Sequence, residues 1–256
     1  MRVPEFIARP YRKYGLRGIL SLLILRGIGA AHEVKVYPPS LRHGLRLRMK
    51  TTDELVFVEV VLEHAYRFDL PFTPRVILDA GANMGVTSIY FANRYPKAKI
   101  FAVEPEPSNY ALLVKNIRPY PSIVPVHAAL WNRDGEVSVS LPDPSTGAVG
   151  NWAFFTHEGE GIRVRAVSME SLLRELALDT VDFVKVDIEG AEVEIFESPD
   201  WVNRVRALAI ETHDELRPGC TAAVTSAMRN FERTHSNGIL LFIRQDGSPS
   251  PVPQRA

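Results

Sequence analysis

A cluster of acidic residues follows an apolar run in the stretch VDIEGAEVEIF. Asp187 comes directly after this run, and Glu211 comes after the next apolar run, with His213 two positions later. Neighbouring parallel strands lie about 4.8 Å apart, so side chains at matching strand ends can converge on one cation or one hydroxyl. We therefore predict Asp187 and His213 as catalytic residues, and Asp187, Glu211 and Glu189 as candidate ligands of a metal ion.

The other charged residues of this stretch have a structural interpretation. Glu189, like Glu192, fits the first turn of the following helix, where negative charge complements the helix dipole by about 0.3–1 kcal/mol. We expect Glu192 and Glu194 on the surface of that helix. Lys185 alternates with apolar neighbours in the preceding strand, so we expect it to point toward the cleft or toward a neighbouring acid.

A glycine-rich turn, LDAGANMG, follows an earlier apolar run. Gly81 permits a tight turn, and Gly85 lets the next helix approach the strand or a ligand closely. A dinucleotide fingerprint beginning at Gly81 would need glycines at two positions that hold Asn83 and Val86. Asp79 would repel a pyrophosphate, whereas it could receive the ammonium of an amino-acid moiety. The turn therefore predicts a ligand other than a dinucleotide.

Two further strand ends complete the expected ligand pocket. Glu104 lies 25 residues after Asp79, where a carboxylate can accept both hydroxyls of a ribose. After the third strand, the small Ala128 and the aromatic Trp131 suit the neighbourhood of an adenine. Together these residues describe a pocket for an adenosine ligand without a diphosphate, and S-adenosylmethionine fits that description.

Apolar runs and helical patterns alternate from residue 75 onward. The predicted strands are RVILDAG, KIFAVEP, IVPVHAAL, DFVKVDI and VRALAIET, and the predicted helices between them include VTSIYFANRY, PSNYALLVKNI, SMESLLRELAL and GAEVEIFES. Ser108 and Ser168 are the expected N-caps of two helices. This alternation indicates an α/β protein with a parallel sheet covered on both faces, whose ligands bind beyond the carboxyl ends of the strands.

The composition limits the classes of partner. Thirty basic and thirty acidic residues in a chain of 256 give no global attraction to nucleic acid, so no nucleic-acid partner is expected. A single cysteine, Cys220, excludes a disulfide framework within one chain and a multi-cysteine zinc site. The low cysteine content also suits a cytoplasmic location.

The charge is nevertheless unevenly distributed along the chain. Residues 1–50 hold eleven Lys or Arg and two Glu, which predicts a basic helical and strand extension. Its longest uncharged run near the N-terminus, Gly18 to Leu25, is far shorter than the roughly 20 residues of a membrane-spanning helix. We expect an amphipathic helix that packs on the main domain, with peripheral membrane contact through residues 1–31 as the alternative.

The main domain is expected to cover residues 51–246. Within it, residues 142–161 form a Gly-rich segment that is too long for a simple connector. This makes the segment a candidate lid over the site where an acceptor substrate would bind. Its aromatic residues could stack on a sugar, and the alternative is a β-extension whose aromatics pack internally; these residues are Trp152, Phe154 and Phe155. The proline-rich tail, 247–256, is expected to be flexible.

Three blocks carry a resemblance to a known family. VILDAGANMGVTSIYFA, AVEPEPSNYALLVKNI and VDFVKVDIEGAEVEIFE, in this order and spacing, resemble the FkbM family of S-adenosylmethionine-dependent methyltransferases over roughly residues 45–245. The resemblance implies a Rossmann-like class I methyltransferase fold, with a mostly parallel seven-stranded sheet, helices on both faces and an antiparallel last strand. It also implies O-methylation of hydroxyls on sugars, glycans and polyketide-type natural products.

The same resemblance assigns roles in the cofactor pocket. It implies that Gly81, Asn83 and Gly85 shape the methionine end of S-adenosylmethionine. Glu104 would hold the ribose, and residues near Ala128 would meet the adenine. Asp79 and Asp187, at the ends of the flanking strands, are the remaining candidate cofactor-binding residues.

Methyl transfer to a hydroxyl leaves two mechanisms open. The hydroxyl oxygen must lie roughly 3 Å from the methyl carbon, opposite sulfur. Because an alcohol is mostly protonated at neutral pH, it needs a base or a cation. In one interpretation Asp187 and Glu211, with Glu189 or His213, hold Mg²⁺ at the hydroxyl. In the other, His213 or Asp187 is a metal-free general base. A merely structural role is the third alternative.

The expected function is therefore an S-adenosylmethionine-dependent O-methyltransferase with a small-molecule or oligosaccharide acceptor, such as a sugar, a glycan, or a glycosylated or polyketide-type metabolite. A non-catalytic module that binds the cofactor, or a partner through its basic N-terminus, is the alternative from another class. The sequence leaves the acceptor, the metal requirement and a homodimer open.

Overall fold

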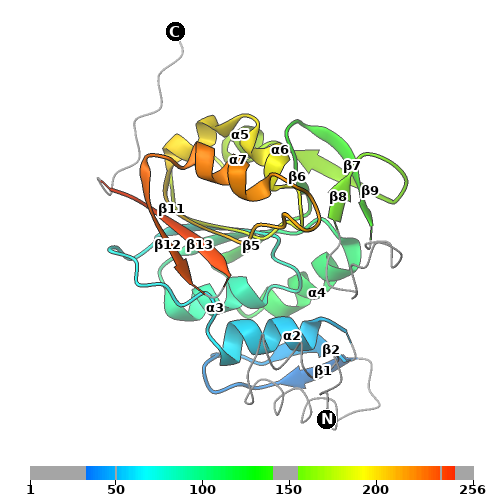
Figure 1. Ribbon diagram of the computed structural model, residues 1–256. Coiled ribbons are helices and arrows are strands. Elements are labelled where there is room, and N and C mark those ends of the chain that lie inside the picture. The colour runs from blue at the N-terminus through cyan, green and yellow to red at the C-terminus, as the bar shows by residue number, and fades with distance from the viewer. Residues whose placement is uncertain (1–32, 50, 141–154, 237, 246–256) are drawn as a thin grey trace, which may run out of the picture.

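A seven-stranded sheet forms the centre of the computed structural model, which describes residues 33–49, 51–140, 155–236 and 238–245 (Figure 1). The strand order is β12-β13-β11-β10-β3-β4-β5. The strands are β3 (Val76–Ala80), β4 (Lys99–Val103), β5 (Ile123–Val126), β10 (Val181–Val186), β11 (Val205–Ile210), β12 (Phe231–Ser236) and β13 (Ile239–Arg244).

The strand directions match the fold expected from the sequence. The neighbours from β5 to β11 all pair in parallel. The last strand, β13, runs antiparallel to both β11 and β12. The prediction of a mostly parallel, seven-stranded Rossmann-like sheet with an antiparallel last strand is therefore confirmed.

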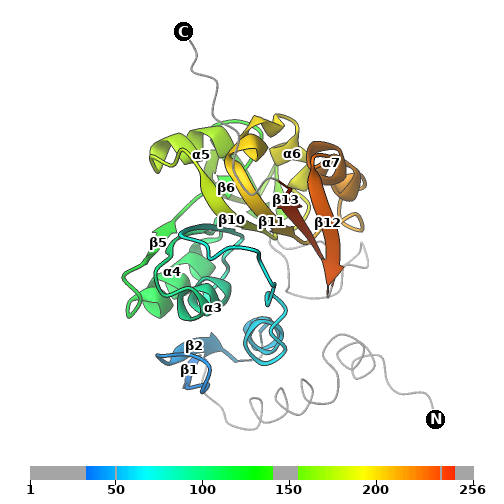
Figure 2. The ribbon, with the colours of Figure 1, turned by 90° about the vertical axis from the view of Figure 1, so that its left-hand side faces the viewer.

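Helices cover both faces of this sheet (Figures 1 and 2). One face carries α3 (Val86–Arg94) and α4 (Pro107–Ile117), and the other carries α5 (Met169–Glu175), α6 (Glu192–Phe196), the 3₁₀ helix η3 (Pro199–Arg204) and α7 (Cys220–Ala227). Successive strand residues point to opposite faces. Accordingly, Ile77 and Phe183 belong to one buried cluster, whereas Leu78 and Val184 belong to the other.

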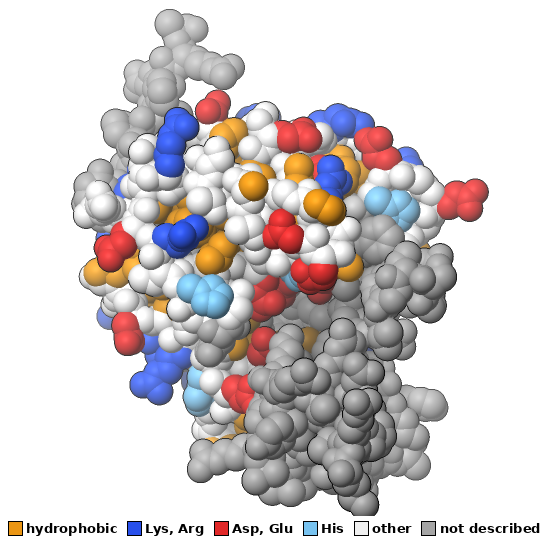
Figure 3. All heavy atoms as spheres, in the orientation of Figure 1, with side chains coloured by type: hydrophobic (Ala, Val, Ile, Leu, Met, Phe, Trp, Pro, Cys, Tyr) orange, Lys and Arg blue, Asp and Glu red, His pale blue; other side chains and the backbone are white. Residues whose placement is uncertain are grey.

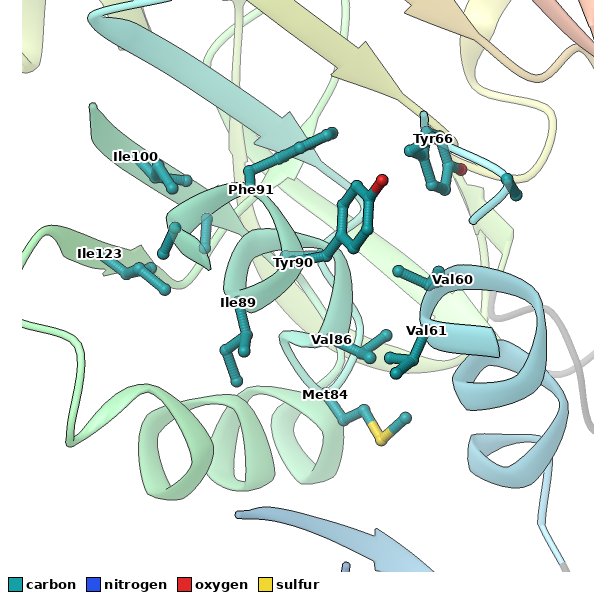
Figure 4. Packing of buried hydrophobic residues seen from close by; sticks show 14 of the residues in the cluster. Val60, Val61, Tyr66, Met84, Val86, Ile89, Tyr90, Phe91, Ile100 and Ile123 are labelled. Carbon is teal, nitrogen blue, oxygen red and sulfur yellow. The ribbon is translucent and has the colours of Figure 1, made fainter. Parts of the chain in front are cut away.

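The N-terminal elements pack beside α3 and α4. They are β1 (Glu33–Val36), β2 (Leu45–Arg48), α2 (Asp53–Phe57) and the π-helical segment η1 (Val58–Leu62). Figure 4 shows Val60 and Val61 of η1 pointing toward Val86 at the start of α3. The backbone N–H of Arg46 donates to Asn116 in α4 at 2.8 Å. Residues 33–49 of the predicted extension are thus part of the packed domain, and residues 1–32 lie outside the described residues.

A second, four-stranded sheet is built from strands that follow β5 along the chain, in the order β6-β9-β7-β8. Its strands are β6 (Ala129–Leu130), β7 (Gly135–Ser140), β8 (Phe155–His157) and β9 (Ile162–Val167). The end of the candidate lid forms β8 and the turn after it, whereas residues 141–154, with Trp152 and Phe154, and the tail from 246 lie outside the described part. In that part, no helix is long and apolar enough to cross a membrane.

Candidate active site

The register of the sheet brings the predicted acids to one edge. Val186, the last residue of β10, pairs with Ala80 of β3 and with Ile210 of β11. The N–H of Asp187 then donates to the carbonyl of Ala80 at 3.1 Å, and the N–H of Glu211 donates to Val186 at 3.0 Å. The two carboxylates therefore follow adjacent strands at the same level.

These two acids meet His213 in a compact group. Asp187, Glu211 and His213 each offer one ligand atom, and these atoms all lie within 4.8 Å of one another. Nε2 of His213 lies 3.6 Å from Oδ1 of Asp187 and 3.3 Å from Oε2 of Glu189. Figure 3 shows several acidic side chains gathered near the middle of one face of the molecule. The structure thus joins four sequence-predicted residues, with His213 rather than Glu189 completing the tightest group.

Glu192 orients the imidazole of His213. Its fully buried carboxylate lies 2.8 Å from Nδ1, so Nε2 faces Asp187 and Glu189. Burial alone would lower the pKa of His213, but the hydrogen bond with Glu192 and the charges of Glu189 and Asp187 raise this pKa to about 10. The expectation that Glu192 lies on the helix surface is therefore wrong.

Two more expectations about this stretch are corrected. Glu194 is buried and pairs with Arg217, because the short helix α6 packs beside α7 on one face of the sheet (Figure 2). Glu189 precedes the helix, which begins at Glu192, and its backbone is left-handed with φ of 54°. Burial and the charge of Asp187 raise the pKa of Glu189 to about 8.

Lys185 lies beneath the acidic group and is 1% exposed. Its Nζ lies 3.3 Å from Oδ1 of Asp79 and 3.6 Å from Oδ2 of Asp187. Burial alone would lower the pKa of Lys185, but the charges of Asp79 and Asp187 raise it, so the side chain stays cationic. The expectation that Lys185 points toward a neighbouring acid is confirmed. Asp79, also fully buried, accepts a hydrogen bond from Ser88 at 2.6 Å.

The glycine turn packs closely on the strand of Asp187. Gly81 has φ of 75°, and a Cβ built there would lie 1.8 Å from the carbonyl oxygen of Asp187. A Cβ on Gly85 would lie 2.5 Å from Leu113 of α4. Asn83 also has a left-handed backbone, with φ of 50°. Its Oδ1 is buried without a hydrogen-bond partner among the described residues, so a ligand donor would satisfy it.

Glu104 lies next to this turn. Its carboxylate accepts the N–H of Asn83 at 2.8 Å and that of Glu106 at 2.9 Å. Burial raises the pKa of Glu104 to about 7, although these two N–H groups act to lower it. Ala128 and Trp131, expected near an adenine, are both buried. A buried carboxylate beside a tight turn fits a ribose.

Tyr66 is a site residue that the sequence did not reveal. Its hydroxyl donates to Oε1 of Glu211 at 3.3 Å, and its ring centroid lies 5.7 Å from Nζ of Lys185. Burial and the charge of Glu211 raise the pKa of Tyr66 well above 10, so the hydroxyl stays a donor. Tyr66 follows η1 in a segment that mixes charged and apolar residues, and no motif distinguishes it from an ordinary core aromatic.

This combination defines a class of protein. A parallel sheet with a non-dinucleotide glycine turn at β3 and a buried acid after β4 fits S-adenosylmethionine-dependent methyltransferases. The family model described as "Methyltransferase FkbM domain" matches residues 79–240, more than half of the chain. The chain therefore belongs to the FkbM methyltransferase family, as the sequence blocks indicated.

Three proteins of other organisms are similar to this chain, at sequence identities of 24% to 27%. The AMB antimetabolite synthetase AmbE of Pseudomonas aeruginosa is 27% identical over 75% of this chain, and the match spans only 11% of AmbE. The hexuronic acid methyltransferase AglP of Haloferax volcanii is 26% identical, covering 70% of this chain and 71% of AglP. The 2-O-methyltransferase NoeI of Sinorhizobium fredii is 24% identical, covering 55% of this chain and 64% of NoeI.

One solved structure that is similar to this chain is that of M. jannaschii TYW2 in complex with AdoMet. It shares 15% sequence identity and has a TM-score of 0.45. The match covers 84% of this chain and 88% of that chain.

Proposed function

We propose that the protein is an O-methyltransferase that transfers the methyl group of S-adenosylmethionine to a hydroxyl of a sugar, a glycan, or a glycosylated or polyketide-type metabolite, with a divalent cation at Asp187, Glu211 and His213. The observation that carries the proposal is the convergence of three ligand atoms within 4.8 Å, beside the cofactor turn. A small-molecule or oligosaccharide acceptor and a cytoplasmic location belong to the same proposal.

The charge of the site favours a hydroxyl over an anionic acceptor. Asp187 and Glu211 would repel a carboxylate or phosphate acceptor, whereas a neutral alcohol meets no such barrier. The name of one relative agrees with this chemistry, because NoeI is a 2-O-methyltransferase, whereas AglP acts on a hexuronic acid, which itself carries a carboxylate. An alcohol still has to lose its proton during transfer, which the acidic group has to assist.

The residues present fit a divalent cation. Asp187 and Glu211 supply carboxylate oxygens, and His213 supplies Nε2 while Glu192 holds Nδ1, an arrangement typical of metal-binding histidines. A bound cation would lower the pKa of a coordinated hydroxyl. An imidazole nitrogen beside two carboxylates suits Mn²⁺ and related metals, whereas Mg²⁺, expected from the sequence, prefers oxygen ligands.

A metal-free mechanism is the second candidate. The closeness of Nε2 of His213 to Asp187, 3.6 Å, favours it, because an acid can orient and charge-balance a histidine base. In that case the neutral form of His213 takes the proton of the acceptor hydroxyl, and Asp187 and Glu189 hold the imidazolium that forms. Because the pKa of His213 is about 10, this neutral form is scarce at pH 7 and turnover by this route should rise with pH.

Turnover in the presence and absence of metal separates these candidates. The full chain is incubated with S-adenosylmethionine and a panel of neutral sugars, uronic acids and glycosylated polyketides, and release of S-adenosylhomocysteine is measured. We expect chelator to abolish release and Mn²⁺ or Mg²⁺ to restore it. Asp187→Asn and Glu211→Gln should each lose about a hundredfold in kcat. Glu136→Gln, at an exposed ion pair in the small sheet, is the matched control.

Two results would contradict the proposal. Full activity after chelation would exclude the metal-assisted mechanism and favour His213 as the general base. Tight cofactor binding without methyl transfer to any hydroxylated acceptor would instead favour a non-catalytic binding module.

A further inference from the structure

Lys185 contacts both the cofactor turn and the acidic group, which no catalytic assignment above explains. Its Nζ donates to the carbonyl of Gly81 at 2.7 Å and to that of Ala80 at 3.3 Å. The same ammonium faces Asp79 at 3.3 Å and Asp187 at 3.6 Å. One cation therefore has oxygen neighbours on two adjacent strand ends.

These contacts connect two parts of the site that have different proposed roles. The Gly81 turn borders the expected methionine end of the cofactor, and Asp187 belongs to the group at the acceptor. Their backbones already touch, because the N–H of Asp187 donates to Ala80 at 3.1 Å and Gly81 leaves no room for a Cβ against the Asp187 carbonyl. The position of Nζ thus constrains both the turn and the Asp187 side chain.

We propose that Lys185 is a positioning residue that holds the cofactor turn at Gly81 and the carboxylate of Asp187 in one fixed arrangement. Its effect on Asp187 rests on the proposed function, whereas its effect on the turn concerns cofactor binding alone. Tyr66 completes the unit, since its ring lies over the ammonium and its hydroxyl donates to Glu211.

The simpler alternative is that Lys185 only neutralises the buried Asp79. The distances favour the larger role, because the shortest contact of Nζ, 2.7 Å, is to the Gly81 carbonyl and not to Asp79. If Lys185 served only as the counter-ion of Asp79 in β3, it would not need to contact Asp187, which follows the neighbouring strand β10. The two roles make different predictions once Asp79 carries no charge.

The test compares Asp79→Asn with the double variant Asp79→Asn/Lys185→Met. Removing both charges avoids leaving one buried ion unpaired, which by itself is strongly destabilising. S-adenosylhomocysteine binding is measured by calorimetry on the full chain. We expect the double variant to bind about tenfold more weakly than Asp79→Asn, because the Gly81 carbonyl loses its charged donor. Affinities that agree within about threefold would overturn the role at the turn.

Turnover tests the second half of the proposal. With an acceptor identified from the panel, we expect kcat of the double variant to fall about tenfold below that of Asp79→Asn, with little change in the acceptor KM. Equal kcat values would show that Lys185 does not position Asp187. If no acceptor is found, the proposed function fails while the binding comparison still decides the role at the turn.

Two further variants complete the test. Lys99→Met removes an exposed lysine at the opposite, amino-terminal end of the sheet, and it should leave binding and turnover unchanged. If the double variant does not fold, Lys185→Arg keeps the charge beside Asp79. Because a planar guanidinium cannot reproduce the contacts of an ammonium, we expect about a tenfold loss of affinity. Wild-type affinity and kcat in Lys185→Arg would overturn the proposal.

Discussion

We expect the ionisation of Glu104 to affect cofactor binding, because Glu104 is the proposed partner of the ribose. Its pKa, raised by burial, is about 7 in the cofactor-free protein. Ribose hydroxyls donate to the ionised carboxylate, so binding favours loss of the proton. Affinity for S-adenosylhomocysteine should therefore be highest above pH 7 and should fall about tenfold between pH 8 and pH 6.

Calorimetry across this pH range tests the role of Glu104. The variant Glu104→Gln should bind more weakly, and its affinity should not change with pH over the same interval. An unchanged pH dependence in Glu104→Gln would assign the titration to another group.

Glu192 should control His213 although it contacts no ligand atom of the proposed cation. Glu192→Gln keeps the size of the side chain but weakens its hold on Nδ1 of His213, so Mn²⁺ affinity should fall about 10- to 100-fold. Glu194→Gln is the matched control, because Glu194 is a buried acid of the same helix that pairs with Arg217 instead. Equal losses in both variants, measured by Mn²⁺ titration, would indicate a general effect of α6 on the fold.

The elements of the site depend on backbone conformations that few residues tolerate. At Gly81, alanine would meet both a positive φ and the Asp187 carbonyl oxygen at 1.8 Å. Gly81→Ala should therefore abolish cofactor binding and lower the melting temperature. Gly219→Ala is the control, because Gly219 has φ of 103° with nothing within 4 Å, so only the strain of about 1–2 kcal/mol applies.

Thermal melting and calorimetry with S-adenosylhomocysteine measure these two glycine variants. Wild-type affinity in Gly81→Ala would show that the turn does not pack closely against the backbone of Asp187.

The sequence predicted the strands better than the detail of the helices. Apolar runs ending in acids predicted β3, β4, β10 and β11, and Ser168 caps α5 as expected, accepting the N–H of Ser171. At α4, however, Glu106 is the cap in place of Ser108. Helix α6 is only five residues long and four of these residues are buried, so the expectation that Glu192 and Glu194 lie on an exposed helix face failed.

Long-range packing explains what the sequence missed at the scale of the whole molecule. Tyr66 reaches Glu211 across 145 positions of sequence, and no local pattern records such a contact. The separate four-stranded sheet was foreseen only as an alternative β-extension of residues 142–161, because strand pairing such as β6 with β9 depends on register rather than composition. By contrast, the number and directions of the seven central strands followed from the family resemblance.

The central claim concerns the whole site: strand ends that bind the cofactor also assemble a cation site for the acceptor hydroxyl. Titration of Mn²⁺ into the protein loaded with S-adenosylhomocysteine, followed by electron paramagnetic resonance, tests it most directly. We expect one bound Mn²⁺ per chain in the wild type, and affinity weakened about a hundredfold or more in Asp187→Asn and in Glu211→Gln. Failure of the wild-type protein to bind Mn²⁺, or wild-type Mn²⁺ affinity in both variants, would contradict the proposed cation site.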